Sequence, residues 1–296
     1  MNKHTLPALF ALLLAPLASG ALDGPAIERV TGLKGTLNEA EAVFKVTAPR
    51  ADIKITVDNW QMPPFMGLTS WAAFTPGKTA EAMVAGDLVL MQDEVNPVMS
   101  ALFDNGLAVT ALHNHFFYDE PKVYFMHIGG EGAAEKLGAG VKAALDRVKA
   151  IRSAQPQPAR MFGTGFTAPT SSIPKAAVEK ILGVITQEKD GMVKAVIGRK
   201  AKMECGCEVG KEMGVNTWAA FAGTADDAIV DGDFVVLESE LQPVLRSLRK
   251  DDVNIVAIHH HMTGENPRYL FLHYWGRGPA EKLATAVKAA LGQTAK

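Results

Sequence analysis

The chain of 296 residues lacks any long run of lysine and arginine, and its formal net charge is −2. A nucleic-acid binder normally carries a basic stripe that neutralises phosphates, so nucleic acid is not an expected partner. After the first residues, no apolar stretch is long enough to span a bilayer, so no stable membrane insertion is expected. A hydrophobic content of 48% with 21% charged residues is typical of an ordinary soluble globular protein.

Cysteine is scarce, because the chain contains only Cys205 and Cys207. One residue separates them, so a disulfide between them would be strained. Two interpretations stay open: two small residues in a strand or turn, or a pair with a redox or soft-metal role. No lipid-acceptor cysteine follows the N-terminal leader, which excludes lipid attachment at a new N-terminus.

Common catalytic motifs are missing as well. The sequence has no glycine-rich phosphate loop after a strand and no nucleophile-elbow pattern. Phosphate-loop and α/β-hydrolase chemistry are therefore not expected.

Residues 1–21 have the pattern of a signal peptide. Lys3 supplies a positive charge, residues 6–17 are apolar, and small residues at 18–21 fit a cleavage site. The sequence predicts cleavage near Ala21 and a periplasmic or secreted protein.

The same histidine motif occurs twice. At a constant offset of 146, positions 86–145 match positions 232–291 without a gap, and 24 of the 60 pairs are identical. Six of the eight histidines belong to this repeat, and they form two sets: His113, His115 and His127 in the first unit, and His259, His261 and His273 in the second. Their retention after duplication is the strongest functional signal in the sequence.

The duplication also predicts the domain organisation. We expect repeat 1 at residues 22–152, a connector rich in Pro, Gly, Ser and Thr at 153–174, and repeat 2 at 175–296. Each unit has the order strands, helix, strand, strand, helix. This βαββα order predicts an α+β fold with antiparallel sheets and helices on one face. The two repeats are expected to pack on each other about a pseudo-twofold axis.

Strand alternation predicts where the histidines lie. Residues 107–117 alternate, which would put Leu107 and Val109 on the same face as His113 and His115. In the second unit, Val253 and Ile255 would likewise share a face with His259 and His261. If the following hairpin centres on Pro121, His127 lies directly opposite His115. Each set of three imidazoles would then form one patch.

Such patches suit a divalent transition metal, with zinc as the first choice and copper as the second. Glu94 and Glu240 match between the units just before a helix, where a carboxylate is also explained by capping. Three functions stay open: metal binding or handling, a metal-dependent hydrolase, and a structural or protein-interaction module. In the hydrolase, a metal-bound water is the nucleophile and Glu94 or Glu240 the general base. A metal ion or a small molecule is the expected partner.

The chain resembles the LppY/LpqO-type family of exported bacterial proteins of unknown function, here as two tandem repeats. The resemblance rests on Trp-Ala-Ala-Phe, Gly-Asp, His-x-His and the returning histidine strand, and residues 257–262 and 271–276 look especially typical. It covers nearly the whole chain after residue 21 and implies an envelope location without a defined activity. Unlike the lipoprotein members, this chain lacks a lipid-acceptor cysteine.

Overall fold

The computed structural model describes residues 22–162 and 170–294. The signal peptide predicted for residues 1–21 lies outside these ranges. Within them, no helix is both long enough and apolar enough to cross a membrane.

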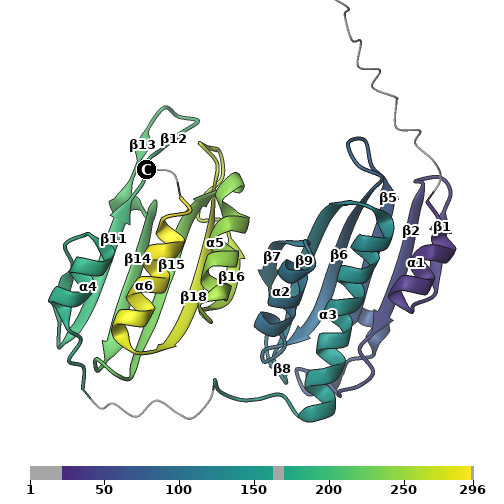
Figure 1. The fold of residues 1–296 in the computed structure, drawn as a ribbon, viewed down its shortest axis with the longest axis horizontal. Coiled ribbons are helices and arrows are strands. Elements are labelled where there is room, and N and C mark those ends of the chain that lie inside the picture. Colours follow the sequence, from purple (N-terminus) through teal and green to yellow (C-terminus); the bar gives the residue numbers. More distant parts are fainter. Residues whose placement is uncertain (1–21, 163–169, 295–296) are drawn as a thin grey trace, which may run out of the picture.

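Two units of matching element order follow each other along the chain (Figure 1). The first unit contains α1 (Gly24–Thr31), β1 (Gly35–Asn38), β2 (Val43–Pro49), β3 (Thr56–Val57), β4 (Trp60–Gln61), η1 (Pro64–Met66), β5 (Thr69–Pro76), β6 (Ala82–Met91), α2 (Val95–Asp104), β7 (Ala108–His113), β8 (Asp119–Glu120), β9 (Val123–Gly132) and α3 (Ala134–Ala154). The second contains α4 (Lys175–Leu182), β10 (Gln187–Lys189), β11 (Met192–Gly198), β12 (Ala201–Met203), β13 (Glu208–Val209), η2 (Lys211–Met213), β14 (Asn216–Gly223), β15 (Ala228–Leu237), α5 (Glu238–Lys250), β16 (Asn254–His259), β17 (Glu265–Asn266), β18 (Tyr269–Gly278) and α6 (Ala280–Leu291).

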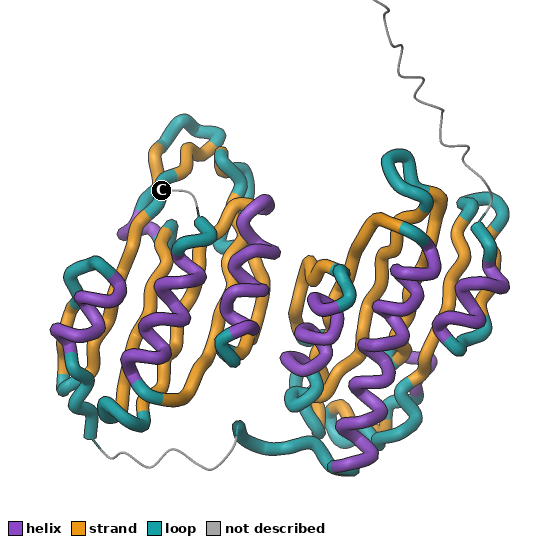
Figure 2. The backbone as a smooth tube through the Cα atoms, viewed as in Figure 1, coloured by secondary structure: helices purple, strands orange, loops and turns teal. Residues whose placement is uncertain are grey.

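One antiparallel sheet of 12 strands runs through both units, in the order β1-β2-β5-β6-β9-β7-β16-β18-β15-β14-β11-β10. The helices of both units lie on the same side of this sheet (Figure 2). A large apolar core fills the space between the helices and the sheet. Two small sheets, β4-β3-β8 and β13-β12-β17, pack with separate apolar clusters. The predicted α+β fold of two similar antiparallel units is confirmed.

A β-bulge interrupts each strand that carries a histidine motif. The register against β9 shifts between Val109 and Ala111, and the register against β18 shifts between Ile255 and Ala257. An extra residue reverses which face the following side chains take. Val109 is therefore buried in the core beneath the helices, whereas His113 lies on the face without helices. The expected uniform alternation along residues 107–117 was wrong for this reason, and no partner unit is needed to cover Val109.

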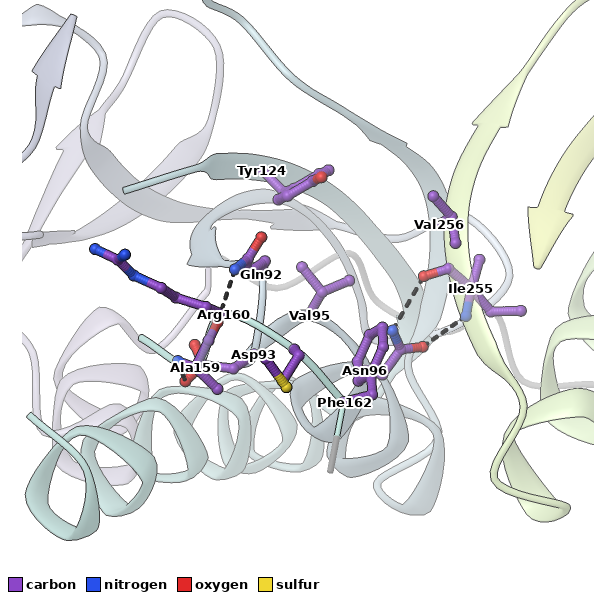
Figure 3. Close-up of a pocket in the computed structure, with 11 residues that line it drawn as sticks. Gln92, Asp93, Val95, Asn96, Tyr124, Ala159, Arg160, Phe162, Ile255 and Val256 are labelled. Carbon is purple, nitrogen blue, oxygen red and sulfur yellow. Dashed lines mark hydrogen bonds between the residues drawn. The ribbon is translucent and has the colours of Figure 1, made fainter. Parts of the chain in front are cut away.

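The two units meet along β7 and β16, which pair through Leu112 and Ile258. These positions are related by the offset of 146, so the seam is pseudo-symmetric. Next to it, the Asn96 amide donates to the Ile255 carbonyl (3.0 Å) and accepts from the Ile255 N–H (2.7 Å; Figure 3). Asn96 thus bonds the other unit, and Glu94 occupies the cap position of α2.

The reciprocal contact comes from the second unit. Gln242 donates to the Val109 carbonyl (2.6 Å) and accepts from the Val109 N–H (3.1 Å). Asn96 and Gln242 are equivalent positions, as are Val109 and Ile255. Two side-chain amides therefore act as short strand segments, each completing the bulged strand of the other unit.

Replacing Gln242 with alanine is expected to destabilise the protein by about 1–3 kcal/mol, because the buried Val109 amide and carbonyl lose their partner. The measurement is the free energy of unfolding in urea. Gln187→Ala, on an exposed edge strand, is the matched control and should leave stability within about 0.5 kcal/mol of wild type. Equal unfolding midpoints for the two variants would contradict the role given to the seam.

Candidate metal centre

The second histidine set lies on the open face of the sheet, opposite the helices. His259 ends β16, His261 follows in the next loop, and His273 lies within β18. The ring centres of His259 and His261 are 5.1 Å apart, and those of His259 and His273 are 4.9 Å apart. The structure therefore brings all three predicted side chains of this unit into one cluster.

A buried carboxylate completes this cluster. One ligand atom from each of Asp233, His259 and His261 lies within 4.8 Å of the other two. Asp233 pairs with His273 across β15 and β18, so its side chain leaves the sheet on the histidine face. The sequence interpretation did not include Asp233 among the candidate ligands. The available signal was its identity with Asp87 inside the ungapped repeat.

Backbone carbonyls orient two of the rings. Nδ1 of His261 lies 3.1 Å from the Gly214 carbonyl oxygen, and Nδ1 of His273 lies 3.2 Å from that of Gly232. An Nδ1–H that donates to a carbonyl leaves Nε2 with a free lone pair, as in many metal-bound histidines. His261 directs its Nε2 to Asp233, where the distance to Oδ2 is 3.2 Å.

Two polar atoms of the cluster are buried without a hydrogen-bond partner: Nε2 of His259 and Oδ1 of Asp233. Burial raises the pKa of Asp233 to about 6, against the opposing effect of His273 and His261. Burial and the neighbouring His273 lower the pKa of His259. The cluster therefore contains a carboxylate and an imidazole that are both desolvated. A bound cation would offset the free-energy cost of burying these two groups.

The first unit repeats the spacing of the rings, although among the described residues only Asp233, His259 and His261 bring their ligand atoms within 4.8 Å of one another. The ring of His113 lies 5.1 Å from that of His115 and 5.2 Å from that of His127. Asp87, which pairs with His127, has a buried Oδ1 without a partner. Burial and the charge of His113 lower the pKa of His115. The first unit thus has the same four residues, one aspartate and three histidines, at equivalent positions.

The expected register of this hairpin was wrong. His127 pairs with Ala111, and Phe125 pairs with His113. The strand β7 ends at His113, and β8 (residues 119–120) pairs with β3 instead of continuing the hairpin. His115 consequently stacks on Phe125, with ring centres 3.3 Å apart, and His127 approaches His113 diagonally.

The two clusters are neighbours on the open face. Because Leu112 pairs with Ile258, antiparallel register places Ala111 beside His259 and Ala257 beside His113. His127 pairs with Ala111, and His273 pairs with Ala257. Across the strands, His127, Ala111 and His259 therefore form one row, and His113, Ala257 and His273 form the next. In each row an alanine separates a histidine of one unit from a histidine of the other, and the strands that carry the two histidines are about 10 Å apart.

The glutamates predicted as general-base candidates are held by arginines. The Glu94 carboxylate is fully buried and lies 2.7 Å from Arg50 Nη1 and 2.9 Å from Arg152 Nε. Glu240 lies 2.5 Å from Arg199 Nη1. Glu94 also accepts the N–H of Met91 at the end of β6, and Glu240 accepts the N–H of Leu237 at the N-cap of α5. The structure gives both carboxylates ion-pairing and backbone partners, and it does not join them to the histidine clusters.

A pocket of about 200 Å³ lies at the seam, where Asn96 meets Ile255. Its walls are mainly apolar and include Val95 and Tyr124 from the first unit and Val256 from the second (Figure 3). None of the six clustered histidines lines it, so it is separate from the candidate metal centre.

Comparisons with known proteins agree with the duplication. A model for the Domain of Unknown Function (DUF1259) matches residues 25–147 and again residues 176–293. No curated protein matches the chain. One solved structure, a trimeric bacterial microcompartment shell protein PduB, is similar at 11% identity and a TM-score of 0.20, covering 87% of this chain and 89% of that one. At that score the likeness carries no argument. By sequence, the chain belongs to the DUF1259 family and contains two copies of its domain.

Proposed function

We propose that the protein binds a divalent transition metal in a binding or handling role, with zinc as the first candidate and copper as the second. The observation that carries the proposal is the second-unit cluster. There, His259 Nε2 and Asp233 Oδ1 are buried and unpartnered within a group of converging ligand atoms. Each unpartnered buried atom costs about 1–3 kcal/mol, which coordination would recover.

The donor set fits zinc. Imidazole nitrogen and carboxylate oxygen are common zinc ligands, and a tetrahedral site takes four. Asp233, His259 and His261 supply three ligand atoms within 4.8 Å of one another. We propose His273, whose ring centre lies 4.9 Å from that of His259, as the fourth ligand. With His273 bound the site would be filled, which favours binding over catalysis at an open position. In the first unit, His113, His115 and His127 with Asp87 would form the second site.

The hydrolase alternative gains no support from the glutamates proposed as its base, since Arg50, Arg152 and Arg199 hold them. The structural alternative predicts that the imidazoles serve folding alone. The titration described below distinguishes this structural role from metal binding.

We further propose export through the leader of residues 1–21, which gives a periplasmic or secreted location. Residues 257–262 and 271–276 carry the narrower similarity to the LppY/LpqO group.

The test is a calorimetric titration of the metal-stripped protein with zinc, copper(II) and magnesium. We expect zinc and copper(II) to bind at or below micromolar concentrations, with up to two ions per chain. Magnesium should give no comparable heat, because it prefers an octahedral shell of oxygen. Zinc at 100 times its Kd should raise the free energy of unfolding by about 2.7 kcal/mol. No zinc binding at micromolar concentrations would contradict the proposal.

A further inference from the structure

The turn between β12 and β13 carries the two thiols of the chain. The Met203 N–H donates to the Cys207 carbonyl (2.9 Å), and the Gly206 N–H donates to the Met203 carbonyl (2.8 Å). Gly206, between the cysteines, has φ +82°, a conformation that glycine adopts without strain. This turn leaves Sγ of Cys205 and Sγ of Cys207 only 2.7 Å apart, and both thiols are free and exposed.

The equivalent turn of the first unit contains no thiols. There, Val57 pairs with Trp60 across a turn formed by Asp58 and Asn59. In the second unit, Met203 bonds Cys207 across residues 204–206, so the turn is one residue longer. The small sheet therefore forms without thiols in one unit, and the thiols are not a requirement of the fold.

Other soft donors lie at the same end of the second unit. Met203 leads into the turn, Met262 follows His261, and both pack against one small apolar cluster. In the first unit, Val57 and Phe116 occupy the equivalent places. The first unit's equivalent cluster contains Met62 and Met91, so the two thiols, and not the methionines, distinguish the second unit's turn.

We propose that Cys205 and Cys207 form a binding site for a soft, monovalent metal ion, copper(I), separate from the histidine centre. Thiolates are the ligands that copper(I) prefers, and two converging thiolates chelate one ion. Zinc–sulfur bonds are about 2.3 Å long, and copper(I) bonds of similar length would hold the sulfurs roughly 4 Å apart. Exposed side chains can open to that distance by rotation about χ1.

The hydrogen bond between the thiols lowers the pKa of Cys205 and raises that of Cys207, so Cys205 is the first to form the thiolate that binds metal. A disulfide across one intervening residue would be strained. Because the two sulfurs are only 2.7 Å apart, the metal site requires the protein to be kept reduced. Binding changes no oxidation state: two thiols release two protons as two sulfur–copper bonds form.

The experiment is anaerobic competition between the reduced full-length protein and a chromophoric copper(I) chelator. We expect wild type to withhold one equivalent of copper(I) from the chelator. Cys205→Ser and Cys207→Ser should each weaken binding at least about 100-fold, because one thiol loses the chelate advantage. Circular dichroism should show the same fold in both variants, since the replaced side chains are exposed.

His259→Ala is the matched control, and it should keep the copper(I) equivalent. Copper(I) binding by the thiols is therefore tested independently of zinc binding by the histidines. Wild-type behaviour of the double serine variant would overturn it. So would loss of copper(I) binding in His259→Ala alone, or a wild-type protein that closes into a disulfide and withholds no copper(I) after anaerobic reduction.

Discussion

Alanine at His259 or at His261 is expected to weaken zinc binding at the second-unit centre by at least about 100-fold, since loss of an outer-shell partner alone costs 10–100-fold. His260 lies between them in sequence but directs Nδ1 to the Tyr269 carbonyl, 3.2 Å away, so His260→Ala is the matched control. The measurement is calorimetric zinc affinity, with thermal unfolding of the metal-free variants alongside.

His113→Ala extends this prediction to the first unit. It should remove one binding event and leave the second-unit event near its wild-type affinity. If His259→Ala and His260→Ala bind zinc equally well, the cluster is not the ligand set. If His259→Ala changes stability without changing zinc stoichiometry, the histidines serve the fold.

Asparagine at position 233 is expected to stabilise the metal-free protein above pH 6 while abolishing tight zinc binding. The folded-state pKa of Asp233 is raised from 3.8 to about 6, so the unfolded chain loses its proton first. Stability therefore falls as pH rises from about 4 to about 6, and the loss persists at higher pH. A shift of about two units corresponds to roughly 3 kcal/mol. The partial loss of the His261 contact reduces the expected gain to about 1–3 kcal/mol.

Asp231→Asn is the matched control for this variant. Asp231 lies two residues earlier on the same strand and the same face, but it is exposed. Urea unfolding at pH 4 and pH 8 should show a gain for Asp233→Asn only at pH 8, and little change for Asp231→Asn at either pH. A variant that is less stable than wild type at pH 8 would show that the carboxylate stabilises the metal-free fold.

The sequence allowed the fold class and each histidine cluster to be predicted, because both follow from a repeat that is directly visible. The offset of 146 links His113 to His259, and period-two spacing places His259 and His261 on one side. The bulges at Thr110 and Val256 could not be foreseen, since neither position contains glycine or another turn signal. They changed which residues share the histidine face.

The carboxylate was missed for a different reason. Asp87 and Asp233 each follow a glycine, and an acidic residue is ordinarily solvated. In the structure, β6 and β15 begin several residues earlier, so each aspartate lies inside a ten-residue strand. The pairing of Asp233 with His273 and its contact with His261 show that it belongs with the histidines. Such a cross-strand relation depends on register, which local sequence does not determine.

The paired amides at the seam have a consequence for divergence. In a symmetric homodimer, both sides of the interface carry the same residue, and one substitution alters both contacts at once. Here the two copies share one chain, and the shorter Asn96 and the longer Gln242 bond equivalent backbone groups. Each half of the contact can therefore change while the other holds the units together. The same freedom extends outward from the seam: one copy can acquire thiols and a different metal affinity without its twin having to follow.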